Sequence, residues 1–163
     1  MKARLVTTCV AVAGVAQLVT GVAPAHGATT CTWGGTPAAP TGHSTNTPGV
    51  STTPSAVPLR FRAAGPLGGG PGCRGTMRFA GQMDKGATCA LINFHARVYG
   101  LRGVRTVIGA SAGGFAPARL FDRAGNLVGT EDAQFLTNAP FSACYAKEGL
   151  RSINFSSVVV LYR

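Results

Sequence analysis

An alternation of apolar and polar side chains, repeated in several segments after Cys73, constrains the fold of this chain more than any other feature. It is clearest in residues 76–83 and 90–99, which the turn sequence Asp84-Lys85-Gly86 separates. Successive side chains of a strand point to opposite faces, so a period of two predicts strands with one buried and one exposed face. The same reasoning predicts further strands at 105–110, 119–121, 127–136 and 152–162.

The connections between these segments also favour strands. Residues 122–126 predict a hairpin turn, because Asp122 can cap it and Gly125 can adopt a left-handed conformation. Only residues 138–149 have helical features, with Asn138 as a suitable N-cap. About eight strands and one short helix predict an all-β fold, which is a single-domain β-barrel or β-sandwich.

Residues 26–72, by contrast, are rich in Pro, Thr and Gly, and they contain seven of the ten prolines of the chain. Proline lacks a backbone donor, so this composition resists a continuous helix or a central strand. Apolar residues such as Val50 and Leu59 interrupt the segment. We therefore expect short edge strands and turns here, within one exported β-rich domain (26–163) whose core lies in 73–163.

Residues 1–25 have the three parts of a secretory signal peptide. Lys2 and Arg4 form a positive start, an apolar stretch follows, and Ala23-Pro24-Ala25 offers small residues to a signal peptidase. Several Thr and Gly residues dilute the apolar stretch, whereas a membrane anchor needs ~20 predominantly apolar residues. We predict cleavage after Ala25, with a site two or three residues later as the alternative. The mature chain is expected to be secreted, with no transmembrane segment.

The cysteines predict two disulfides. Cys9 leaves with the signal peptide, and the four cysteines that remain are an even count in an exported chain. Three pairings are open. We favour Cys31–Cys73, which would clip down the Pro-rich part, and Cys89–Cys144, which would tie the helix to the sheet. No metal site is predicted, because there is no Cys-x-x-Cys pair and the histidines are scattered.

The charge balance favours an anionic partner. The net charge is +10, and +8 remains once Lys2 and Arg4 are removed with the signal peptide. Such an excess attracts anionic polymers or surfaces, although it also serves solubility alone. No specific nucleic-acid motif is present, and aromatic side chains that could stack on single-stranded bases are scarce.

One group of polar residues forms a candidate binding face. If segments 59–62, 76–83 and 90–99 are neighbouring strands, their polar faces gather arginines on one surface. Arginine binds carboxylate or phosphate through two parallel hydrogen bonds. The alternative is an ordinary solvated face. The candidate binding residues are Arg60, Arg62, Arg74, Arg78, Asn93, His95 and Arg97.

Catalytic and cofactor motifs fail when their context is considered. Residues 109–113 spell G-x-S-x-G around Ser111, but glycine and proline follow, where a nucleophile elbow needs a helix, and no histidine comes later. A protease-like order of His43, Asp84 and Ser111 exists, but the flanking residues are wrong. The glycine-rich segment 65–75 lacks the Lys-Ser/Thr of a phosphate-binding loop. We assign no catalytic residue and no cofactor.

Three segments carry a resemblance that covers nearly the whole mature chain. Residues 31–42, 72–77 and 122–129 resemble those of a group of small exported actinobacterial proteins that have no assigned function. The resemblance implies export and one β-rich domain, and it provides no site residues.

These observations favour an exported, soluble, non-enzymatic binding or envelope-associated module. One alternative is a small serine hydrolase that uses Ser111. Another is a lipocalin-like carrier, because a barrel of about eight strands can hold one small apolar ligand. Glu131 and Asp132 are adjacent, so they would face opposite sides of a strand, which disfavours a glycosidase pair.

Overall fold

The computed structural model describes residues 27–135 and 141–162. The predicted signal peptide, residues 1–25, and the predicted N-cap Asn138 lie outside the described residues. No helix within the described ranges is both long and apolar enough to cross a membrane.

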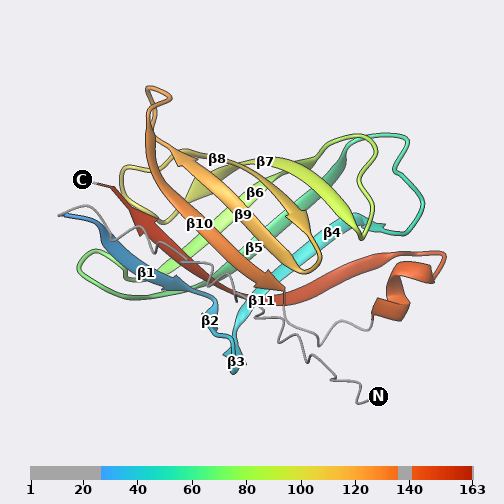
Figure 1. The fold of residues 1–163 in the computed structure, drawn as a ribbon, viewed down its shortest axis with the longest axis horizontal. Coiled ribbons are helices and arrows are strands. Elements are labelled where there is room, and N and C mark those ends of the chain that lie inside the picture. Colours follow the sequence, from blue (N-terminus) through green and yellow to red (C-terminus); the bar gives the residue numbers. More distant parts are fainter. Residues whose placement is uncertain (1–26, 136–140, 163) are drawn as a thin grey trace, which may run out of the picture.

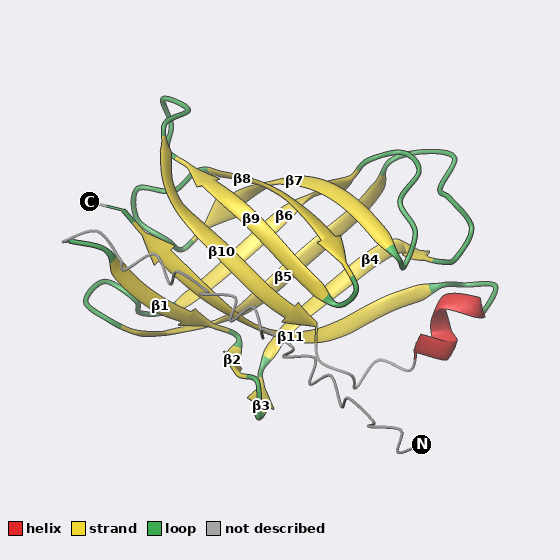
Figure 2. Cartoon of the chain, in the orientation of Figure 1, coloured by secondary structure: helices red, strands yellow, loops and turns green. Residues whose placement is uncertain are grey.

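Eight antiparallel strands close into a β-barrel, which confirms the all-β prediction and selects the barrel over the sandwich (Figures 1 and 2). Each strand pairs with the next one in the chain, and the last pairs with the first of the eight. The strands are β4 (Gly42–Val50), β5 (Leu59–Gly69), β6 (Thr76–Met83), β7 (Leu91–Tyr99), β8 (Thr106–Ala112), β9 (Phe115–Phe121), β10 (Leu127–Phe135) and β11 (Leu150–Leu161).

Strand β1 (Thr29–Trp33) occupies the same position in the barrel wall as β4, end to end with it. Both strands pair with β5 on one side and with β11 on the other. Between them the chain leaves the wall in a small hairpin of β2 (Gly35–Thr36) and β3 (Ala39–Pro40). The hairpin projects from the lower edge of the barrel in Figure 1.

The expectation of short edge strands in 26–72 is wrong. Strands β4 and β5 have nine and eleven residues and lie inside the closed wall. Closure of the barrel gives each strand a neighbour on both sides, and the prolines are tolerated within it. Pro66 still accepts a hydrogen bond from the Gly34 amide at 2.9 Å, so it loses only the bond that its own nitrogen cannot donate.

The core extends through the inside of the barrel and draws on both halves of the chain. Trp33 lies at its centre, 2 % exposed, with its ring centroid 4.4 Å from that of Phe79 and 4.5 Å from that of Phe155. Its indole nitrogen donates to the Met77 carbonyl at 3.0 Å, so its polar atom is satisfied. Apolar side chains with no exposed surface fill the space beyond Met77; they include Val107, Leu120 and Val159.

Both predicted disulfides are present. Cys31–Cys73 joins β1 to the connection before β6, at the filled end of the barrel. Cys89–Cys144 joins the β6–β7 connection to η1 (Phe141–Tyr145) at the opposite end.

The predicted helix is shorter and tighter than expected. The described part of that segment is a 3₁₀ helix of five residues, and no α-helix is found among the described residues. Cys144 is buried whereas Tyr145 is 80 % exposed, so the two do not share the buried face that a helix would give them. The disulfide holds Cys144 inward, and Gly149, at φ +67°, turns the chain into β11.

Candidate functional site

A cavity of about 90 Å³ lies inside the barrel at the Cys89–Cys144 end. Trp33, Phe79 and Phe155 line its inner part, and the two cysteines line its outer part. A buried water needs roughly 10–15 Å³, so this space exceeds the need of one water several-fold. The walls are mostly apolar, and the polar residues that line the cavity are Ser44, Asn46, Ser111 and Glu131.

Glu131 is a carboxyl group inside the barrel. It lies on β10 and is 2 % exposed, whereas the neighbouring Asp132 is exposed. The two acidic side chains therefore face opposite sides, as predicted. The Ser157 hydroxyl donates a hydrogen bond to Glu131 Oε1.

Burial raises the pKa of the Glu131 carboxyl from its ordinary 4.5 to about 8. The hydrogen bond from Ser157 opposes this shift in pKa, and the negative charge of Asp132 adds to it. The physical cause is the loss of hydration of the charged form in an apolar interior. Glu131 is therefore mostly protonated at neutral pH, and a neutral carboxyl group lines the cavity.

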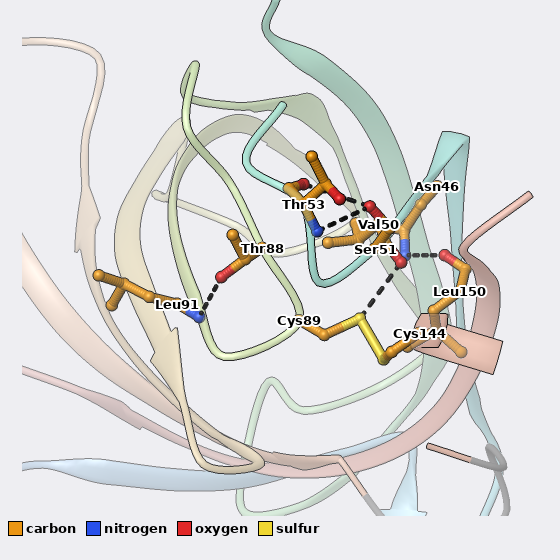
Figure 3. The surroundings of a disulfide bond; sticks show 9 residues. All are labelled: Asn46, Val50, Ser51, Thr53, Thr88, Cys89, Leu91, Cys144 and Leu150. Atoms are coloured by element: carbon orange, nitrogen blue, oxygen red, sulfur yellow. Dashed lines mark hydrogen bonds between the residues drawn. A yellow bond between two sulfur atoms is a disulfide. The ribbon is translucent and has the colours of Figure 1, made fainter. Parts of the chain in front are cut away.

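Asn46 is the second buried polar group on the cavity wall. Its side-chain nitrogen donates to the Leu150 carbonyl at 3.1 Å (Figure 3). Its Oδ1 atom is buried and has no hydrogen-bond partner among the described residues. Leaving a buried acceptor unpaired costs about 1–3 kcal/mol, so the site favours an occupant that donates a hydrogen bond.

The Cys89–Cys144 disulfide holds the outer part of the cavity together. Both cysteines line the same cavity as Asn46 and Leu150, and Figure 3 draws these residues together. Cys89 Sγ lies 3.2 Å from the Val50 carbonyl oxygen, which is a contact without a shared proton because a disulfide sulfur carries no hydrogen. The ends of β4, β7 and β11 at the cavity are thus linked by this disulfide and by the polar contacts of Asn46 and Val50.

The predicted arginine face lies on the outer wall of the barrel. Strands β5, β6 and β7 are neighbours, as that prediction required. Arg62 and Arg97 are the two cross-strand partners of Ala80, and Arg60 and His95 are those of Gln82. The small Ala80 leaves a shallow hollow between the longer side chains Arg60, Gln82, His95 and Arg97.

The other predicted binding residues do not line this hollow. Arg78 is exposed on β6 and pairs with Tyr99, and Asn93 is exposed on β7. Arg74 is exposed in the connection before β6 rather than on the strand. Within the described ranges, the one contact within 4 Å between a carboxylate and a basic side chain joins Asp84 and His95 at 3.6 Å, so no arginine there is neutralised by a carboxylate at that distance.

The serine and histidine residues do not assemble into a hydrolase site. Ser111 lines the interior cavity, whereas His43 is exposed and contacts Asn154 Oδ1 at 3.1 Å. His95 is on the outer wall, where it meets Gln82 at 3.2 Å. Among the described residues, neither histidine hydrogen-bonds Ser111, and no three Cys, His, Asp or Glu side chains gather as metal ligands.

Sequence reasoning did not find the interior site. The face of β10 that points inward carries Gly129, Glu131 and Ala133, which has no apolar pattern to mark it as buried. The neighbouring strand could have shown that Glu131 points inward. Glu131 pairs with Ala118, and Ala118 belongs to the clear alternation of buried and exposed residues in β9. Asn46 lies in the Pro/Thr-rich part, where no apolar alternation marks it as inward-facing either.

Comparisons with known proteins found no counterpart: no protein-family model matches the chain, and no curated protein and no solved structure is significantly similar to it.

Proposed function

We propose that this protein is an exported, non-enzymatic binding protein that holds one small ligand inside its barrel. The observation that carries the proposal is the unpartnered, buried Asn46 Oδ1 on the wall of an otherwise apolar cavity. Small-ligand sites combine an apolar lining with a few polar groups that orient the ligand. The cavity of this barrel has that composition, and it favours the carrier hypothesis over the hydrolase.

Export is part of the proposal and rests on two features. Residues 1–25 have the order of parts that a signal peptidase recognises. The two disulfides fit an oxidising compartment outside the cytoplasm. N-terminal sequencing of secreted protein tests this part; a chain that begins at Met1 would contradict it.

Trp33 provides a direct test of interior binding. It is the single tryptophan of the chain and lines the inner part of the cavity. Titration with methylcyclohexane, which does not absorb where tryptophan does, should change the Trp33 emission saturably. Ser111→Phe, which places a ring in the cavity, should abolish the change, whereas Arg62→Gln on the outer wall should leave it intact.

A second candidate function is binding of an anionic polymer or surface by the arginine face. The hollow over Ala80, with exposed arginines that lack carboxylate partners in the described part of the chain, favours it. Guanidinium groups without a carboxylate partner are available to bind phosphate, sulfate or carboxylate groups of a ligand. This outer site and the interior site are separated by the barrel wall, so one protein can carry both.

A further inference from the structure

The polar groups of the cavity restrict the chemistry of its ligand. None of the described residues that line it is Lys, Arg or His, so an anionic group inside would find no cation among them to pair with. An unpaired buried charge is strongly disfavoured.

The orientation of the Asn46 amide specifies what the ligand must offer. The Leu150 carbonyl can only accept, so the amide nitrogen must face it and the oxygen must face away. That oxygen is the buried atom without a partner. An occupant that meets it must therefore donate a hydrogen bond, as a hydroxyl or amino group does.

The positions of the polar and apolar groups set the shape of the ligand. Asn46 lies near Leu150, where β11 begins, and Leu150 pairs with Val50. Trp33 lies deeper, since it pairs with Ser157 farther along β11, whereas Phe61 is level with Asn46 as its cross-strand partner. A ligand that reaches both has one donor group toward the Cys89–Cys144 end and an apolar body toward Trp33.

On the basis of the proposed function, we infer that the interior ligand is a compact apolar molecule with a hydroxyl group, or an uncharged amino group, that donates to Asn46 Oδ1. Carboxylates and phosphates of the same size are excluded from this site. The apolar lining makes the body of the ligand a hydrocarbon, and a cavity of about 90 Å³ suits a compact ring or a short chain.

Four ligands of matched size test this inference in the full mature protein at pH 7. Cyclohexanol, methylcyclohexane, cyclohexanecarboxylate and cyclohexylamine, which is a cation at pH 7, are titrated by calorimetry and by Trp33 emission. Cyclohexanol should bind about tenfold more tightly than methylcyclohexane, which corresponds to one additional hydrogen bond to a buried acceptor. Cyclohexanecarboxylate should bind most weakly.

Two variants assign the selectivity to a residue. Asn46→Leu should retain methylcyclohexane binding and lose the tenfold preference for cyclohexanol. Arg123→Gln, in the exposed turn after β9, should leave that preference unchanged. If Asn46→Leu does not fold, cyclohexanone on the native protein decides, because the ketone accepts but cannot donate, so tighter binding of cyclohexanol than of cyclohexanone requires a free acceptor in the cavity.

The outcomes separate this inference from the function on which it rests. Equal binding of cyclohexanol and methylcyclohexane would overturn the donor requirement and leave interior binding intact. Tightest binding of the carboxylate, or a preference for cyclohexylamine alone that Glu131→Gln removes, would also overturn the role of Asn46. Absence of binding by all four ligands would instead overturn the proposed function.

Discussion

Ser157 donates a hydrogen bond to Glu131 inside the barrel, where both side chains are almost fully buried. The two residues come from neighbouring strands, β11 and β10, and Ser157 pairs with Ala133, the next inward position after Glu131. The hydroxyl provides one partner for a carboxyl group that has lost its hydration. One hydrogen bond does not offset that loss, which is why the pKa of Glu131 stays raised.

This raised pKa predicts that stability falls as pH increases. The folded pKa of about 8 exceeds the ordinary 4.5, so the folded chain holds its proton longer than the unfolded chain. The associated stability is fully present below pH 4.5 and is lost as pH rises through 8, with a slope of at most about 1.4 kcal/mol per pH unit. Urea unfolding across this range measures it. Glu131→Gln should flatten the dependence, and a native protein that gains stability over the same range would contradict the assignment.

The two disulfides are expected to differ in their effect on ligand binding. Replacing either pair with alanine should cost about 2–4 kcal/mol of unfolding free energy, because each closes a loop of tens of residues. Only the Cys89/Cys144 double variant should also weaken methylcyclohexane binding, since these residues line the cavity. The Cys31/Cys73 variant is the matched control at the filled end. Equal loss of binding in both variants would show that the effect is general destabilisation.

Gly34 is expected to tolerate no side chain. The residue has φ +75°, and an added Cβ would lie 2.7 Å from the Gly42 Cα and 2.8 Å from the Phe155 carbonyl oxygen. Gly34→Ala should therefore destabilise by more than the roughly 1–2 kcal/mol of left-handed strain alone. Gly103→Ala is the control, because its φ is +81° and nothing lies within 4 Å of the added Cβ. Thermal unfolding compares the two variants. Equal losses of stability would mean that backbone strain accounts for the whole effect.

Exchange of arginines on the outer wall tests the anionic-polymer candidate. With duplex DNA as a regular polyanion, the triple change of Arg62, Arg78 and Arg97 to Gln should lower the slope of log affinity against log salt by roughly two to three, since each phosphate contact contributes about 0.9. The control is a triple change of the exposed Arg105, Arg123 and Arg151. If the control weakens binding equally, net charge rather than a face is responsible.

Local patterns predicted much of the fold because strand faces depend on neighbouring residues. The alternation in 76–83 and 90–99 assigned the inward side chains of β6 and β7 correctly. The hairpin turn at 122–126 is present, with the Asp122 carboxylate accepting from the amides of Ala124 and Asn126 at 2.8 and 2.9 Å. The same reasoning was wrong where proline dominated, because it could not anticipate that β4 and β5 would gain partners on both sides.

The sequence by itself determined most strands after Cys73, the faces of those with clear alternation, and the availability of four cysteines for pairing, because each of these depends on residue type and short-range order. Only the tertiary structure decided that the wall closes, through the pairing of β11 with β4 and with β1. It also decided that Asn46 and Glu131, 85 positions apart by their numbering, line one cavity. The physical reason is that a cavity arises between side chains of facing strands, and closure of the barrel is what makes those strands face one another.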